Sequence, residues 1–417
     1  MEHKQIPEKN FVREKIKNKP LNHKRVAGKT VVSALCGAVF ALTTCATLLL
    51  LMPVLRMRWD ESAETPSSQQ TVVRETETHT QSQEAALFQE GKGAPTLEDY
   101  QRFQTELYAI GNRANRSIVT ITSVVNDTDW FNNTYEREGQ GSGTIIGDRN
   151  GKLYILTEKK TITDASEIQV TFINEESAPA QLMKYDGNTG LAVLSVDKGQ
   201  LEDSTLSSIA VMETGTPKTV HKGSMVIALG SPLGTNYSIL TGNVTATNNE
   251  ISTQDRNYSV YTTDIVANKN GSGILINTEG RMVGVVMQDF NTASSSTLTA
   301  VDVAELEPVL ELLYTNRDVP NLGIYTSTVT DKIAGKYKIP KGVYIKEVAV
   351  DSPAMRAGLR RGDVIVGFQG NKVRDAGDLS SMILELSVGQ SCPVVVKREG
   401  TGGYKEVTCK VEAGVLK

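Results

Sequence analysis

The string TTDIVANKNGSGILINTEGRMVGV, residues 262–285, is the stretch around which the rest of the chain can be interpreted. An apolar segment leads into a polar turn at 268–273, and a second apolar run at 274–276 leaves it. Ser272 stands between two glycines, which relieve steric limits on the backbone. Such a turn can present a hydroxyl and neighbouring N–H groups to a bound carbonyl, although small polar turns also end ordinary hairpins.

Upstream, the N-terminal part of the chain predicts a membrane anchor. Residues 1–30 are basic, and residues 31–55 contain no charged side chain. A helix of that length, at about 1.5 Å per residue, is long enough to cross a hydrocarbon core of about 30 Å. The run exceeds the roughly 7–15 apolar residues of a cleaved signal peptide, which is the competing interpretation. The basic flank places the N-terminus in the cytoplasm and the chain after residue 56 in an extracytoplasmic compartment.

Composition limits the remaining possibilities. A length of 417 residues allows two or three domains, and 39% apolar content suffices for sizeable cores. The net charge of −4 gives no electrostatic case for nucleic acid. Residues 56–94 are rich in Glu, Thr, Ser and Gln and predict a flexible stalk. A helix is expected next, with Thr96 as its cap and an apolar face made by Leu97, Tyr100, Phe103, Leu107 and Ile110.

Short β-branched runs separated by turns fill residues 118–313 and predict an antiparallel barrel or sandwich. Four motifs, at 139–146, 153–157, 190–196 and 225–234, precede the serine turn. Their order resembles that of HtrA-family trypsin-like proteases. The resemblance implies a mainly β chain, with a trypsin-like double β-barrel domain over 95–316 followed by a PDZ domain over 317–417.

The same resemblance assigns positions residue by residue. Ser272 matches the nucleophile, whereas Lys160 stands where the family has its histidine and Gly190 where it has the orienting aspartate. Asn270 and Gly271 form an altered oxyanion loop. A serine hydroxyl needs a base to take its proton, and loss of that base costs on the order of a million-fold in turnover.

We therefore expect a proteolytically inactive domain, without cofactor or metal. The alternative is an active serine endopeptidase in which Lys160, with a pKa depressed by burial, serves as the base for Ser272.

The C-terminal segment carries the most specific motif of the chain. SPAMRAGLRRGDVI, residues 352–365, resembles the corresponding string of HtrA-type PDZ domains. Leu322, Gly323 and Ile324 match the loop that binds a peptide carboxylate through backbone N–H groups. Apolar residues over 378–386 predict a second helix. The resemblance implies that this helix forms one wall of a peptide groove.

Cys392 and Cys409 flank the last predicted hairpin at equal distances from its centre, so a tight turn would place them opposite one another. The sequence is compatible both with a disulfide between them and with a pair of unpaired buried thiols.

The charge-free run predicts a single-pass cell-membrane protein, and the resemblance to the HtrA family implies a role in envelope protein quality control. Its expected partners are peptides or unfolded segments, and the resemblance adds active HtrA relatives and a homotrimer as further options.

Overall fold

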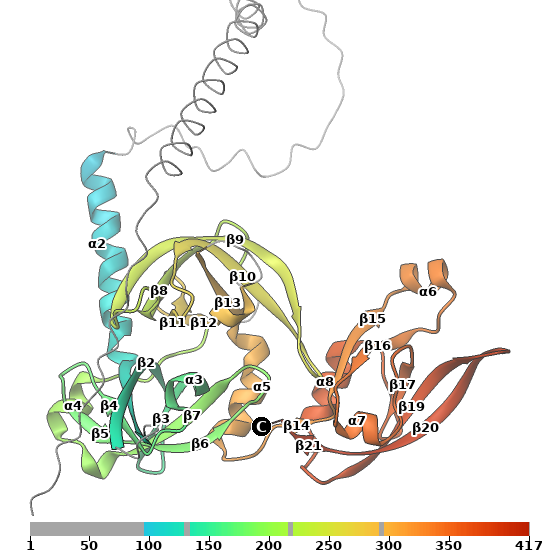
Figure 1. Cartoon of the computed structure of the whole chain (residues 1–417). Helices are drawn as coiled ribbons and strands as arrows, with labels where there is room; N and C mark the ends of the chain where they lie inside the picture. The colour runs from blue at the N-terminus through green and yellow to red at the C-terminus, as the bar shows by residue number, and fades with distance from the viewer. Residues whose placement is uncertain (1–95, 129–133, 216–219, 292–295, 417) are drawn as a thin grey trace, which may run out of the picture. The chain divides into compact units, whose positions relative to one another are not determined.

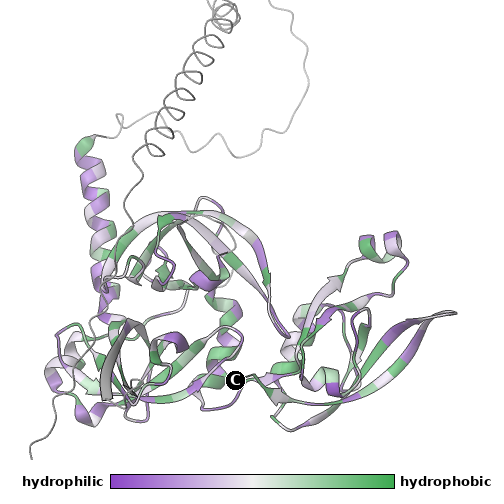
Figure 2. Ribbon diagram, in the orientation of Figure 1, coloured by the Kyte–Doolittle hydropathy of each residue, from purple (hydrophilic) through white to green (hydrophobic). Residues whose placement is uncertain are grey.

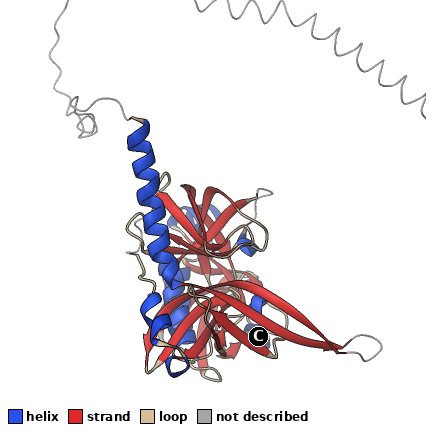
Figure 3. Ribbon diagram, turned by 90° about the vertical axis from the view of Figure 1, so that its left-hand side faces the viewer, coloured by secondary structure: helices blue, strands red, loops and turns tan. Residues whose placement is uncertain are grey.

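The computed structural model of the protein describes residues 96–128, 134–215, 220–291 and 296–416. The predicted basic segment, membrane helix and stalk lie outside these ranges, so the described residues do not test them. No helix within the described ranges is long and apolar enough to span a membrane. Strands dominate what is described, as predicted (Figure 3).

Thr96 caps helix α2 (Leu97–Ala114), as the sequence predicts, and forms a capping box with Asp99. Its C-terminal half packs on the fold, with Leu107 fully buried. The N-terminal half extends past the strands, so the predicted apolar face is largely solvent-exposed there (Figure 1). Leu97 is 69% exposed and Tyr100 is 59% exposed.

The first β-sheet has seven strands in the order β5-β4-β1-β2-β3-β7-β6. The predicted double barrel is therefore only half right, because this sheet has two edges, β5 and β6, that do not pair with each other among the described residues. Pro179 ends β5 and has no N–H to donate, which is typical of a sheet edge. The elements of this half are η3 (Asn115–Ser117), β1 (Ile118–Thr128), β2 (Thr134–Arg149), β3 (Lys152–Glu158), α3 (Lys159–Ile162), β4 (Glu167–Thr171), β5 (Ser177–Pro179), β6 (Gln181–Tyr185), β7 (Leu191–Asp197), η4 (Lys198–Gln200) and α4 (Asp203–Ser208).

The second half is a closed barrel in the order β10-β13-β12-β11-β8-β9, as the sequence predicts. Its strands alternate buried and exposed side chains where one face meets solvent, and β12 is buried along its whole length. The elements are β8 (Met225–Ser231), β9 (Ser238–Ser252), β10 (Asn257–Val266), β11 (Ser272–Ile276), β12 (Met282–Val286), η5 (Gln288–Phe290) and β13 (Thr297–Asp302).

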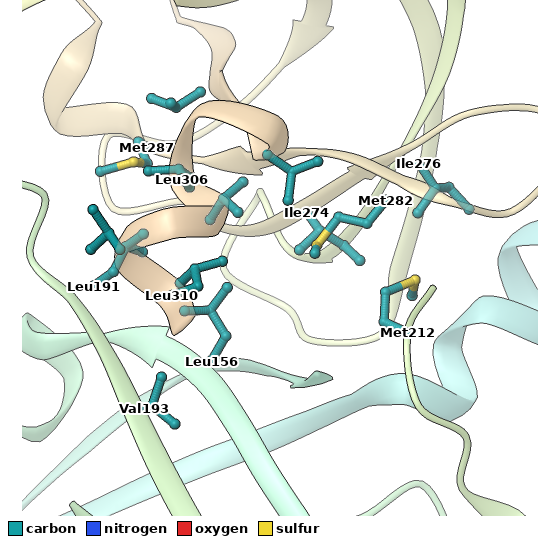
Figure 4. Close-up of a cluster of buried hydrophobic side chains, with 14 of the residues drawn as sticks. Leu156, Leu191, Val193, Met212, Ile274, Ile276, Met282, Met287, Leu306 and Leu310 are labelled. Carbon is teal, nitrogen blue, oxygen red and sulfur yellow. The ribbon is translucent and has the colours of Figure 1, made fainter. Parts of the chain in front are cut away.

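Helix α5 (Val303–Tyr314) follows the barrel and joins the two halves. Asp302 caps it by accepting a hydrogen bond from the N–H of Ala304. Leu306 and Leu310 of α5 lie among apolar side chains of β3, β7, β11 and β12 (Figure 4). Green apolar positions gather on α5 and on the strands around it (Figure 2). One continuous core therefore fixes the two halves that flank the serine turn.

The C-terminal part forms a separate core around Phe368 and Ile383. Its main sheet runs β15-β16-β17-β19-β20, with β18 paired to β17, and β14 pairs with β21. Ser352 caps α7 and Pro353 occupies its first turn, as predicted, and the second predicted helix is α8. The elements are β14 (Pro320–Asn321), β15 (Ile324–Val329), α6 (Asp331–Tyr337), β16 (Gly342–Val348), α7 (Pro353–Arg356), β17 (Val364–Phe368), β18 (Asn371–Lys372), α8 (Ala376–Leu384), β19 (Ser391–Gly400), β20 (Gly403–Glu412) and β21 (Gly414–Val415).

The register of the last hairpin corrects the predicted placement of its two cysteines. Cys392 pairs with Val411, and Cys409 pairs with Val394. The turn is centred one residue later than the symmetric arrangement requires, because Gly400 pairs with Gly403. Both thiols are free and buried in the core, and burial raises the pKa of Cys392.

Candidate functional site

Ser272 is the first residue of β11 and is held inside the barrel wall. It pairs with Ser231 of β8, and its side chain is buried, with the residue 5% exposed. Its Oγ accepts a hydrogen bond from the backbone N–H of Ser142 at 3.3 Å. The hydroxyl predicted to be a nucleophile is therefore part of the strand packing between the two halves.

Backbone N–H groups of the turn before Ser272 donate to carbonyl groups of the protein itself. The N–H of Gly271 donates to the carbonyl of Asn268 at 2.9 Å, and the N–H of Asn268 donates to the carbonyl of Pro232 at 2.8 Å. Asn270 lies exposed in the turn. An oxyanion hole needs N–H groups aimed at a substrate oxygen, and that of Gly271 already has a partner.

The space beside Ser272 is small. The cavity lined by Ser272, Ser142, Thr157, Glu158 and residues of β11 and β12 measures about 10 Å³. A volume of that size holds about one water molecule. A peptide side chain does not fit into it in this conformation.

Lys160 lies in the single helical turn α3, directly after β3, where the family resemblance places the base. Its Nζ lies 3.1 Å from an oxygen of Glu158 and 3.6 Å from an oxygen of Asp289. Its side chain is 37% exposed. Among the described residues no hydrogen bond joins this amine to Ser272, so the two groups of the alternative serine–lysine dyad are not bonded to each other in this structure. Burial raises the pKa of Glu158, and the ammonium of Lys160 opposes that shift.

Gly190 closes the loop between β6 and β7 in a left-handed conformation, with φ of +70°. Its N–H donates to the carbonyl of Asp186 at 2.8 Å, and its own carbonyl accepts from the N–H of Lys159 at 2.6 Å. The structure therefore brings the predicted aspartate position next to the turn that carries Lys160. Asp186 itself accepts bonds from Asn188 and Thr189 and shapes the loop.

The second predicted site consists of the backbone N–H groups of Leu322, Gly323 and Ile324, here called the carboxylate cradle. All three N–H groups donate to one side chain, that of Asp255, at distances between 2.6 and 3.1 Å. Asn321 adds its side-chain amide at 2.8 Å. Burial raises the pKa of Asp255, and these donors oppose the rise.

Asp255 lies in the turn between β9 and β10, and Figure 1 shows this yellow hairpin reaching from the barrel to the start of β15. Sequence reasoning did not single out Asp255. Nothing local distinguishes it from other turn aspartates, and its partners lie 67 to 69 residues further along the chain.

A separate cavity, which none of the cradle residues lines, lies between the barrel and the C-terminal part. It measures about 550 Å³ and is lined by Thr328 of β15, by Ala376 and Ser380 of α8, and by Arg256 and Tyr258 of the barrel. Its volume is in the range of ligand pockets, which are about 300–1,000 Å³. Within the described ranges no group of three or more potential metal ligands occurs.

Two parts of the chain match known domain families. Residues 141–285 match the trypsin-like peptidase domain family, and residues 320–411 match the PDZ domain family. A serine protease Do-like HtrA of Lactobacillus helveticus is 29% identical over 67% of this chain and 70% of the relative. A probable periplasmic serine endoprotease DegP-like of Hahella chejuensis is 30% identical over 69% of this chain and 61% of the relative.

The chain belongs to the HtrA family. Another relative, the serine protease Do-like HtrA of Bacillus subtilis (strain 168), is 28% identical, and the alignment spans 66% of this HtrA-family chain and 63% of that protein. The fold of the HtrA-type protease AlgW, solved with a decapeptide, matches with a TM-score of 0.53 at 22% identity over 74% of this chain and 98% of that one. AlgW with a tripeptide gives a TM-score of 0.52 at 23% identity.

Proposed function

We propose that this HtrA-family protein binds peptides or unfolded protein segments through its PDZ domain and does not cleave them. The observation that carries the absence of cleavage is the ion pairing of Lys160 with Glu158 and Asp289, with no hydrogen bond from Lys160 to Ser272 among the described residues. An ammonium group in ion pairs has no lone pair with which to accept the serine proton. The small cavity at Ser272 and the internal bond of Gly271 support the same conclusion.

A labelling experiment tests the absence of catalysis. The full chain is incubated with a fluorophosphonate probe to detect labelling and, in a separate reaction, with casein to detect cleavage. We expect no labelling and no cleavage above the level of the Ser272→Ala variant. Ser231→Ala is the matched control, because Ser231 pairs with Ser272 across the two strands.

The competing function, a serine endopeptidase with an atypical base, predicts the opposite outcome. Labelling of the wild type that disappears both in Ser272→Ala and in Lys160→Met would establish it. Labelling that persists in Ser272→Ala would instead identify another nucleophile.

Peptide binding is supported by the PDZ family match and by the three N–H groups that converge on a carboxylate in the cradle. Backbone donors of this kind hold the C-terminal carboxylate of a peptide that adds to a sheet edge. A fluorescein-labelled pool of random decapeptides with free C-terminal carboxylates should bind the full chain. The same pool with C-terminal amides should bind more weakly, and equal binding of the two pools would contradict the proposal.

The proposed setting is the extracytoplasmic side of the cell membrane, with residues 31–55 as the anchor. The charge-free run in the sequence supports this placement. Retention of the full chain in the membrane fraction after alkaline extraction, and its release when residues 1–55 are deleted, would test it. Active HtrA relatives and further copies of this chain are proposed partners, which co-purification and mass measurement would reveal.

A further inference from the structure

The carboxylate cradle is already occupied by a residue of the barrel. We propose that Asp255 is an internal ligand of the cradle, which a peptide with a free C-terminal carboxylate must displace in order to bind. This inference rests on the proposed peptide binding and adds a regulation of the same site. The β9–β10 hairpin thereby becomes a built-in competitor of the peptide.

The contacts of Asp255 reproduce both halves of a peptide terminus. Its carboxylate oxygens accept from Leu322 at 2.6 Å, from Gly323 at 3.1 Å and from Ile324 at 3.1 Å. Its backbone N–H donates to the carbonyl of Ile324 at 2.7 Å. A peptide that adds a strand beside β15 requires the same two elements, a carboxylate for the N–H groups and an N–H for the strand.

Occupation by Asp255 and by a peptide is mutually exclusive. Asp255 is only 2% exposed, and each N–H of the cradle lies within hydrogen-bond distance of its oxygens. A second carboxylate would have to share these donors and would be repelled by the charge already present. The peptide can therefore enter only after the hairpin turn has moved out.

Other contacts hold the turn in its place. Thr253 binds the carbonyl of Arg256 through its N–H at 2.8 Å and through its hydroxyl at 3.1 Å. From the β6–β7 loop of the first sheet, the side-chain amide of Asn188 donates to the carbonyl of Gln254 at 2.8 Å. Asp255 itself has φ of +64°, a left-handed conformation that Asp adopts more readily than most residues. The turn presents its carboxylate in a fixed direction.

Hydrogen exchange tests the internal ligand without any peptide. We compare the full chain with Asp255→Gly, which removes the carboxylate while glycine accepts the left-handed backbone. Asp164→Gly is the matched control, because Asp164 is also left-handed, with φ of +59°, and lies in an exposed turn. In Asp255→Gly the amides of Leu322, Gly323 and Ile324 should exchange about tenfold faster or more, since charge-assisted bonds are lost. The control should leave them unchanged.

Peptide affinity tests the competition. The fluorescein-labelled decapeptide pool with free carboxylates should bind Asp255→Gly about tenfold or more tightly than the wild type, because the open fraction of the cradle rises. Asp255→Asn, which keeps the shape but not the charge, should fall between the two. The amidated pool should show no such gain.

The outcomes separate this inference from the function on which it rests. Equal exchange at the cradle in Asp255→Gly and the wild type would overturn the internal ligand, and equal pool affinities would overturn the competition. If neither protein binds the pool although exchange at the cradle accelerates, the peptide-binding function fails and the internal ligand stands.

Discussion

At the scale of single residues, Gly323 shows how closely the cradle is packed. Its φ is +85°, and a Cβ placed on it would lie 2.3 Å from the Cβ of Ser352. We expect Gly323→Ala to lower the free energy of unfolding by about 1–3 kcal/mol, because an L residue is strained there and Ser352 has to shift. Chemical denaturation with urea measures the change.

Gly335 provides the control for that substitution. It lies inside α6 with open space around its Cβ position and without a left-handed backbone. Gly335→Ala should be neutral or should stabilise the protein by up to about 1 kcal/mol, since alanine favours a helix. If Gly323→Ala were as mild as Gly335→Ala, the packing at the cradle would be looser than described.

Glu158 makes stability depend on pH. Burial raises its pKa above the ordinary value of 4.5. A carboxyl whose pKa is higher in the folded state contributes stability that is present below the unfolded pKa and is lost as the pH rises through the folded pKa. The wild type should therefore lose stability relative to Glu158→Gln as the pH rises above about 4.5. Unfolding free energies of both proteins over a pH series test this, and parallel curves would contradict it.

At the scale of secondary-structure elements, turn α3 is bonded to the β6–β7 loop through Gly190, and η5 contacts both α3, through Asp289, and the turn before β11, through Gln288. Lys160 and Gly190 can be exchanged for the family residues, since the Cβ position of Gly190 faces open space and aspartate tolerates its backbone. We expect the variant with Lys160→His and Gly190→Asp to leave casein intact. The bond of Gly271 to Asn268 and the small cavity at Ser272 would remain.

The comparison for that variant is the same protein with Ser272→Ala added. Casein cleavage by the first and not by the second would show that only the two exchanged side chains silence the domain. In that case the turn before β11 rearranges when substrate arrives.

The elements were predictable from the sequence where a local pattern fixes them. Thr96, Ser352 and the apolar residues of α8 predict their helices. The short alternating strands predict a barrel or a sandwich, and only the family resemblance favours the closed barrel that is found. The predicted register of the last hairpin is wrong, because a shift of the turn by one residue moves Cys409 two places along its partner strand. The contact of Asp255 with the cradle could not be found, since it depends on the distant packing of two domains.

At the scale of the whole molecule, two separate groups of buried apolar side chains stabilise the described part of the chain. Phe368 belongs to a cluster made only of residues from 322 onward, whereas Leu229 belongs to the cluster around α5. Phe368→Ala should cost about 3–5 kcal/mol in the first cluster. Hydrogen exchange should accelerate at amides of β16 and β17 and stay unchanged at β8. Equal acceleration in both would mean that the described chain unfolds as one cooperative unit.

The five-residue loop from Asp186 to Gly190 touches two distant neighbours at once. Asn188 donates to the hairpin turn that carries Asp255, and Gly190 accepts from the start of α3. A small environment-sensitive dye attached at position 190, where a Cβ would meet no atom within 4 Å, would therefore report optically whether the hairpin is docked. Such a signal would let ligand arrival at the far domain be followed in real time, without any proteolytic assay.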